Sequence, residues 1–214
     1  LVEPGLPIAA WQIRRSNVHG VVATLHARGY ATVMSDHVPD DYTAIAERLR
    51  QQLARHDVLV LSGGVSAGRF DHVPAALAAA GVRCVFHRIA QRPGRPFWFG
   101  TTPAGRTVFA LPGNPVSTLV CLVRYVLPAL ERLAGAAPAP AASVLLAADC
   151  GMLAEFARFL PVDLVVEDDG VCRACPRPTN GSGDFTSLAG TDGFVELASG
   201  HAWHRGAAVP FRSW

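Results

Sequence analysis

The sequence predicts an α/β domain with a doubly wound, mostly parallel sheet over residues 1–134, followed by a small all-β domain over residues 143–214. Two patterns predict this fold class. In the first half, apolar runs of strand length alternate with apolar residues at helical spacing, as in βαβ units. In the second half, short strand-like runs are separated by turn residues. Residues 135–142 (GAAPAPAA) have the small-residue composition of a linker, so we place the domain boundary there.

Helices and strands are predicted in alternation along the first half. The helices are expected from the caps Ser16 and Asn17 onward, around the repeat Ile45, Leu49 and Leu53, over residues 71–80, and from Pro115 to about Ala134. The strands are expected over residues 32–35, 58–61, 83–87, 97–99 and 107–111, with the last two forming a hairpin. In the second half, the strand-like runs are residues 143–148, 158–166, 171–175, 194–198 and 207–211.

The composition excludes several classes of protein. A net charge of +2 with 17% charged residues gives no basic field of the kind that nucleic-acid-binding proteins carry. Five scattered cysteines, an odd number, indicate reduced thiols rather than a disulfide framework. The most apolar segment, residues 116–133, contains three charged residues and Pro128, so it predicts a packed helix rather than a membrane span. No signal-peptide pattern opens the chain, and a cytoplasmic location is expected.

A loop of small residues, SGGVSAG at 62–68, follows the apolar run at 58–61. The run predicts a central strand that is covered on both faces. Ligands of open α/β sheets bind at the carboxyl ends of strands, and a loop with few Cβ atoms lets its backbone amides approach an anion closely. The loop lacks the endings of the nucleotide P-loop and the dinucleotide fingerprint. It therefore predicts an anion site of another kind, with a tight strand-to-helix turn as the alternative.

Charged residues follow this loop in the sequence. Asp71 is a candidate Mg²⁺ ligand, or alternatively a cap for the next helix. Arg92 and Arg95 lie three residues apart around Pro93 and Gly94, so their loop is stiff. Two arginines held in a stiff loop indicate a site that clamps an oxyanion. The alternative interpretation is that both are solvated surface residues without a ligand.

A second rigid loop, LPGNPVS at 111–117, precedes the last helix of the first half. Its two prolines enclose a glycine and an asparagine, and the first-turn amides of the following helix are unpaired. Such an amide-rich corner is typical of binding sites, although a generic turn has the same composition. The candidate binding residues here are Pro112, Gly113, Asn114, Pro115 and Ser117.

Two pairs of residues have the spacing of metal ligands. They are Cys172 with Cys175 and His201 with His204. Both pairs lie in strand-like segments, where residues three apart point to opposite faces, so half-buried thiols and surface histidines are favoured over a zinc site. The remaining histidines have no nucleophile or carboxylate partner by spacing, so a hydrolase triad is not supported.

Four motifs, in this order and at this spacing, closely resemble the molybdopterin molybdenumtransferase family of the MoeA and gephyrin E-domain type. They are SGGVSAGRFD at 62–71, AQRPGRP at 90–96, LPGNPVS at 111–117 and GSGDFTSLAGTDG at 181–193, with further matches at 15–17 and 38–41. The resemblance implies a pterin-binding α/β domain followed by a C-terminal β domain. It also implies insertion of molybdate into adenylylated molybdopterin with release of AMP, assisted by a divalent cation.

The resemblance implies a role for each candidate residue. The implied catalytic residues are Asp71, Asp40, Arg92 and Arg95, and Asp71 is also the implied metal ligand. The implied substrate-binding residues are Asn17, Ser62, Gly63, Gly64, Ser66, Gly68, Pro112, Gly113, Asn114, Pro115 and Ser117. The implied cofactors and substrates are Mg²⁺, molybdopterin in its adenylylated form, and molybdate.

The chain departs from the family pattern at three residues. Arg15 stands where the family usually has Asp, and Arg92 and Arg95 stand where it has Lys. Arginine keeps the charge but presents a planar fork of donors in place of a point cation.

Family members carry two further domains before this region, and those domains complete the site across a homodimer. This chain is therefore expected to be the C-terminal part of the enzyme, with the molybdopterin adenylyltransferase as a further partner. Two alternatives remain. One is a non-catalytic molybdopterin-binding or scaffold module. The other is the adenylyltransferase activity itself, against which the 111–117 corner and the β domain argue.

Overall fold

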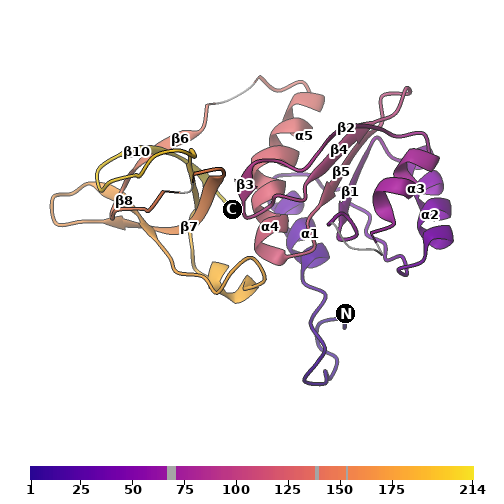
Figure 1. The fold of residues 1–214 in the computed structure, drawn as a ribbon, viewed down its shortest axis with the longest axis horizontal. Coiled ribbons are helices and arrows are strands. Elements are labelled where there is room, and N and C mark those ends of the chain that lie inside the picture. Colours follow the sequence, from indigo (N-terminus) through magenta and orange to yellow (C-terminus); the bar gives the residue numbers. More distant parts are fainter. Residues whose placement is uncertain (67–70, 138–139, 153) are drawn as a thin grey trace.

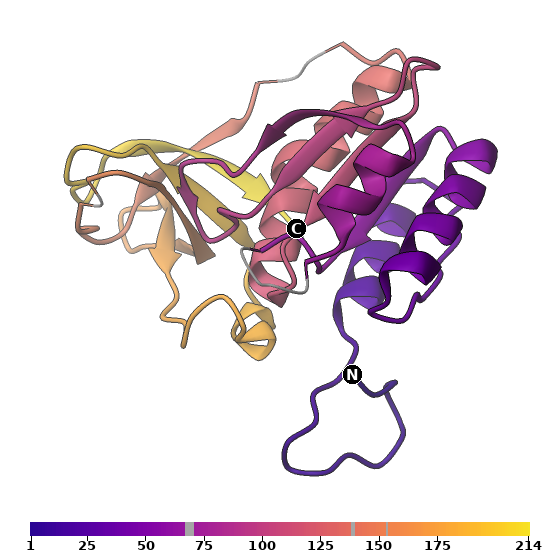
Figure 2. The same cartoon turned by 45° about the vertical axis from the view of Figure 1, so that its right-hand side comes forward.

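The computed structural model describes residues 1–66, 71–137, 140–152 and 154–214. Figure 1 shows two bodies side by side, a helix-and-sheet domain built by the first part of the chain and a barrel built by the last part. The segment before the first helix extends away from both bodies (Figure 2).

A four-stranded mixed sheet forms the centre of the first domain. Its strands are β1 (Val58–Ser62), β2 (Arg83–His87), β4 (Trp98–Thr101) and β5 (Thr107–Leu111), in the order β1-β5-β4-β2. β1 and β5 are parallel, but β4 is antiparallel to both of its neighbours. The α/β class is confirmed, but the sheet is mixed, so the prediction of a mostly parallel sheet is wrong. A parallel pair needs a crossover of a dozen or more residues, and the segments 88–97 and 102–106 on either side of β4 are shorter than that.

The strand predicted at residues 32–35 does not form. This segment connects α1 to α2 outside the sheet, and Met34 within it is 79% exposed. Branched residues favour a strand only where a neighbouring strand supplies a hydrogen-bonded ladder. The sheet ends at β1 on one side and at β2 on the other, and neither edge pairs with this segment.

Helices cover both faces of the sheet (Figure 1). One face carries α1 (Asn17–Ala27) and a long helix built from α4 (Pro115–Cys121), the π-helical turn η1 (Leu122–Val126) and α5 (Leu127–Leu133). The other face carries α2 (Tyr42–Arg55) and α3 (Val73–Ala79). Every residue of β5 is buried, and its side chains alternate between the two apolar clusters. No helix in the described part of the chain is long and apolar enough to cross a bilayer.

The second body is a closed five-stranded barrel. Its strands are β6 (Ala142–Leu146), β7 (Ala157–Val166), β8 (Cys172–Pro176), β9 (Gly193–Leu197) and β10 (Ala208–Ser213). They follow one another in the order β7-β8-β6-β10-β9, and β9 pairs with β7 to close the ring. All five runs predicted as strands in this half form strands. The barrel interior is filled by Leu146, Val162, Ala174, Val195, Leu197 and Val209.

The barrel and the first domain share one apolar core. Phe159, Leu188 and Phe194 of the barrel belong to the same buried cluster as Phe97 and Val123 of the first domain. Continuous burial of this kind holds two bodies in one arrangement, whereas a small polar contact would leave them free to move.

Two polar contacts lie at the rim of the shared core. The guanidinium of Arg124 on η1 donates to both carboxylate oxygens of Glu196 on β9, at 2.7 and 3.2 Å. The short strand β3 (Gln91–Arg92) pairs in parallel with Ala157 and Arg158 of β7. The loop with the two candidate arginines therefore begins as a short extra strand at the edge of the barrel sheet.

We predict that Phe194→Ala lowers the free energy of unfolding by about 3–5 kcal/mol, because it leaves a cavity in the shared core. Phe194 is fully buried, and its ring lies 5.7 Å from that of Phe159 and 5.2 Å from that of Trp214. Urea denaturation measures the change. Phe185→Ala, at a ring that is 36% exposed, is the matched control and should cost much less. Equal losses for the two variants would contradict a shared core.

Candidate functional site

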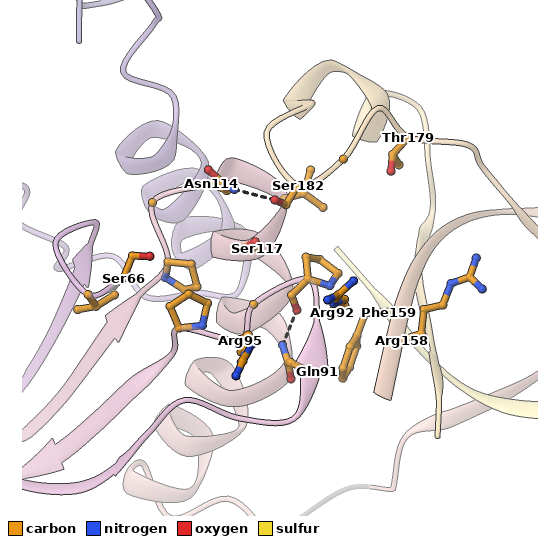
Figure 3. A pocket seen from close by; sticks show the side chains of 18 of the residues that line it. Ser66, Gln91, Arg92, Arg95, Asn114, Ser117, Arg158, Phe159, Thr179 and Ser182 are labelled. Carbon is orange, nitrogen blue, oxygen red and sulfur yellow. Dashed lines mark hydrogen bonds between the residues drawn. The ribbon is translucent and has the colours of Figure 1, made fainter. Parts of the chain in front are cut away.

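A cavity of about 740 Å³ lies between the two domains (Figure 3). Three segments of the first domain line it, at residues 63–66, 91–96 and 112–117. The barrel supplies the opposite wall, with residues 158–161 of β7 and the loop around 179–182. The glycine loop, the arginine loop and the proline corner, which the sequence singles out separately, thus meet at one place.

The glycine loop and the proline corner meet because β1 and β5 are parallel neighbours. Their last residues, Ser62 and Leu111, are paired in the sheet, so the two following loops leave from the same edge. The amide of Gly63 donates to the carbonyl of Leu111 at 3.1 Å. Gly63 and Gly64 both have positive φ, and a Cβ on Gly64 would lie 2.6 Å from a methyl carbon of Val73. Glycine is therefore required where this loop turns onto α3.

Asn17, at the start of α1, ties the two loops together. Its side-chain amide donates to the hydroxyl of Ser62 at 2.8 Å and to the carbonyl of Gly113 at 2.7 Å. Its side-chain oxygen is buried and has no hydrogen-bond partner in the described part of the chain. Asn17 does not line the cavity. Its two hydrogen bonds position the loops, and direct substrate binding by Asn17 stays a prediction.

Arg92 and Arg95 lie on the cavity wall and are both exposed. Their guanidinium carbons lie 4.9 and 5.4 Å from the centre of the Phe156 ring, which the barrel contributes. Cations over an aromatic face are attracted by its quadrupole. Both arginines thus contact the same ring, which favours a paired clamp over two independently solvated side chains.

The barrel adds polar groups that the sequence pattern does not reveal. Arg158, Thr179 and Ser182 line the cavity from the barrel (Figure 3), and Arg158 is paired with Arg92 between β7 and β3. Asn114 donates from its side-chain amide to the hydroxyl of Ser182 at 2.7 Å, and the amide of Val116 donates to the carbonyl of Ser182 at 3.1 Å. The motif at 181–193 contains Ser182, but its sequence cannot show that it faces the proline corner, because that depends on how the barrel docks.

The charged side chains of the described lining are all arginines, namely Arg92, Arg95 and Arg158. No Asp, Glu or His is among these lining residues, so the cavity attracts anions. Ser66 stands at the centre of a Gly-x-Ser-x-Gly run at 64–68, but the lining supplies no base for it. The arrangement is suited to binding and orienting anionic groups rather than to a serine nucleophile.

Several candidate residues lie outside this lining. They are Asn17, Asp40, Ser62, Asp71 and Pro115, and Gly68 lies outside the described residues. Asp40 is exposed in the loop before α2, and Asp71 is half-buried two residues before α3. The N-cap residue of α3 is His72, so the alternative prediction that Asp71 caps this helix is wrong.

A metal site formed by protein side chains alone is not present in the described residues. They contain no group of three or more His, Cys, Asp or Glu side chains that could hold a metal ion. Asp71 offers a single carboxylate, which suits Mg²⁺ only in the mode where substrate phosphates and water complete the coordination.

Comparison with known families gives two matches that together cover most of the chain. Residues 5–132 match a probable molybdopterin binding domain, and residues 145–214 match the MoeA C-terminal region, domain IV. A molybdopterin molybdenumtransferase of Synechocystis sp. is 38% identical over 205 residues, which cover 95% of this chain and 50% of that protein. One from Nostoc sp. is 34% identical over 64% of this chain and 32% of its own length. The chain thus spans about half the length, or less, of these relatives.

Solved structures show the same architecture. A molybdopterin biosynthesis MoeA protein from Pyrococcus horikoshii superposes on 99% of this chain with a TM-score of 0.76 and 27% identity, using 51% of its own chain. A molybdenum cofactor biosynthesis protein from Pyrococcus furiosus superposes on 94% of this chain with a TM-score of 0.69 and 22% identity, using 64% of its own chain. The second likeness concerns the fold alone.

We predict that Gly94→Ala destabilises the protein more than Gly105→Ala. Both glycines have positive φ, so an alanine at either position costs about 1–2 kcal/mol. At Gly94 the new Cβ would also lie 2.4 Å from Nε2 of Gln91 and 2.7 Å from the sulfur of Cys121, whereas Gly105 has open space. This clash should add at least about 1–3 kcal/mol. Urea denaturation of both variants checks the difference, and equal losses would show that the loop is not packed against the long helix.

Proposed function

The chain belongs to the molybdopterin-binding domain family, here joined to a MoeA C-terminal region, and we propose that it serves in molybdenum cofactor biosynthesis. The proposed reaction is the insertion of molybdate into adenylylated molybdopterin with release of AMP, as in a molybdopterin molybdenumtransferase. The relatives that carry this name support the assignment. Because the chain spans about half of their length, the activity is proposed for the natural protein that contains these two domains.

One observation carries the proposal. The three candidate segments and the barrel enclose a cavity of about 740 Å³, and the charged residues of its described lining are three arginines. Both substrates are anions, since molybdate is an oxyanion and the pterin nucleotide carries phosphates. The volume is within the range of about 300–1,000 Å³ that is usual for small-molecule sites.

Each wall of the cavity has a proposed role. The amides of the glycine loop face the pterin phosphate or pyrophosphate, and the corner at 112–115 shapes the place of molybdate. Arg92 and Arg95 bind the oxyanion, and their planar forks offer two parallel hydrogen bonds to one anion. Arg158 and Ser182 complete this surface from the barrel. These residues bind and orient both anions, so that the two reacting groups are held together.

Mg²⁺ is proposed as the cofactor, with Asp71 as its ligand and Asp40 as a second carboxylate. Mg²⁺ commonly binds through one or two carboxylates together with substrate phosphates, and the single carboxylate at Asp71 fits that mode. When bound, the ion would neutralise charge on the phosphates. A homodimer, a cytoplasmic location and supply of the substrate by a molybdopterin adenylyltransferase are further parts of the proposal.

We predict that Arg92→Ala and Arg95→Ala each raise the KM for molybdate about 10- to 100-fold, the range of one lost charge-assisted hydrogen-bonding group. The measurement is molybdate-dependent AMP release by the full-length natural protein. Arg83→Ala, at an exposed arginine of β2 outside the cavity lining, is the matched control and should leave KM unchanged. An unchanged KM in both cavity variants would exclude the arginines from oxyanion binding.

We predict that Asp71→Ala abolishes molybdate-dependent AMP release, because the cation loses the carboxylate that is proposed as its ligand. The same assay, titrated with Mg²⁺, tests this role. Asp168→Ala, at an exposed carboxylate of the barrel, is the control for loss of a negative charge and should release AMP normally. Normal AMP release by the Asp71→Ala variant would contradict the proposed role of Asp71 as the cation ligand.

A further inference from the structure

Gln91, at the start of the arginine loop, forms a hydrogen-bonded pair with Tyr125 of the long helix. Gln91 is only 2% exposed. Its side-chain nitrogen donates to the carbonyl of Pro93 at 2.8 Å (Figure 3). The same nitrogen lies 3.6 Å from the sulfur of Cys121. The side-chain oxygen of Gln91 accepts a hydrogen bond from the hydroxyl of Tyr125. The amide of Gln91 is thus bound on both sides, once to its own loop and once to the long helix.

This hydrogen bond is held by its surroundings. Burial raises the pKa of Tyr125 to about 12, so the hydroxyl keeps the proton that it donates. The ring of Tyr125 stacks on Phe97 with 5.2 Å between centroids, and Phe97 is buried. The ring is therefore fixed by packing, and the hydroxyl alone makes the link to Gln91. An amide that loses its partner in such a place is left unsatisfied.

The π-helical turn η1 accounts for the position of Tyr125. Pro128 has no N–H to donate to the carbonyl of Arg124, and its ring would clash with that carbonyl in a regular α-helix. The helix widens instead, and the amide of Leu127 donates to the carbonyl of Leu122. Arg124 on the same turn binds Glu196 of the barrel. One widened turn thus contacts both the barrel and the arginine loop.

The loop itself has few other buried anchors. Arg92 and Arg95 are exposed, and Gly94 packs without a side chain against Gln91 and Cys121. The amide of Phe97 donates to the carbonyl of Gly94 at 3.2 Å.

Cys121 and Tyr125 of the long helix both make polar side-chain contacts with the loop. The thiol of Cys121 lies 3.8 Å from the carbonyl of Gly94, and the hydroxyl of Tyr125 donates to Gln91. A thiol is a weak donor, so the bond between Tyr125 and Gln91 is the stronger of the two.

We propose that Gln91 and Tyr125 are positioning residues that hold the arginine loop so that Arg92 and Arg95 present their guanidinium groups to one anion. The identity of that anion as molybdate rests on the proposed function. Neither residue touches the substrate in this proposal. Tyr125 does not line the cavity, and both act through the backbone of residues 91–96.

The test compares Tyr125→Phe with Tyr30→Phe. Tyr30 is also half-buried against the shared core, but it makes no side-chain hydrogen bond in the described structure, so the same chemical change there removes no link. In the full-length natural protein, Tyr125→Phe should raise the KM for molybdate about 3- to 10-fold, with kcat within about twofold, because one neutral hydrogen bond is lost. Tyr30→Phe should change neither constant. Gln91→Met removes the bond to Tyr125 together with the bond to Pro93, so it should raise the KM at least as much.

A second readout does not depend on the activity. Amide hydrogen exchange of residues 91–97 should accelerate in Tyr125→Phe and not in Tyr30→Phe, while exchange in the barrel core stays unchanged. If the unsubstituted protein releases no AMP, the proposed function fails, and this exchange measurement still decides whether the pair fixes the loop. Unchanged exchange in Tyr125→Phe overturns the proposal. So does an unchanged KM in an active enzyme, or a loss of kcat without a change in KM.

Discussion

Packing of the barrel against the long helix is the interaction on which the candidate site depends. Phe159 and Phe194 of the barrel are buried in the same cluster as Val123 and Phe97 of the first domain. Burial of large aromatic side chains contributes about 1.5–3 kcal/mol each, so this contact outweighs the exposed ion pairs of the molecule. The cavity exists only because this core fixes the barrel wall opposite the glycine loop. Neither domain by itself encloses it.

The part of the site that follows directly from a strand could be predicted from the sequence. The run at 107–111 forms the fully buried strand β5, and the run at 58–61 forms strand β1. β1 is an edge strand and mostly half-buried, so its prediction as a central strand is wrong. Each strand is followed by a loop that lines the cavity. The pattern works here because a strand covered on both faces must be apolar throughout, and because turn residues mark its end. The family match agrees with the motifs that carry the resemblance, and these motifs are local as well.

The parts that could not be predicted depend on contacts between distant segments. Residues 32–35 have strand-like composition but no neighbouring strand, and β4 runs antiparallel because its connections are too short for a crossover. Arg158 lies in a run that predicts a strand. The alternation of side chains along a strand indicates which face of the sheet a residue occupies, but not that this residue reaches the cavity. From the sequence, Gln91 is an ordinary polar residue of a loop. It is buried because the long helix packs beneath it in the folded protein. A lone sequence gives no signal for such burial.

The widened turn of the long helix has a consequence for how proteins of this kind can recombine. Arg124 and Tyr125 are adjacent in sequence, yet one binds the barrel and the other binds the arginine loop. A residue inserted or deleted before them in the helix would rotate both by about 100°, since an α-helix has 3.6 residues per turn. Recombination of two parental genes at the 135–142 linker would likewise take Arg124 from one parent and residue 196 from the other. The ion pair between Arg124 and Glu196 would then be lost wherever the second parent has no carboxylate at that position. The segment that must descend from one parent therefore runs from the arginine loop through the long helix into the barrel, and it does not coincide with either domain.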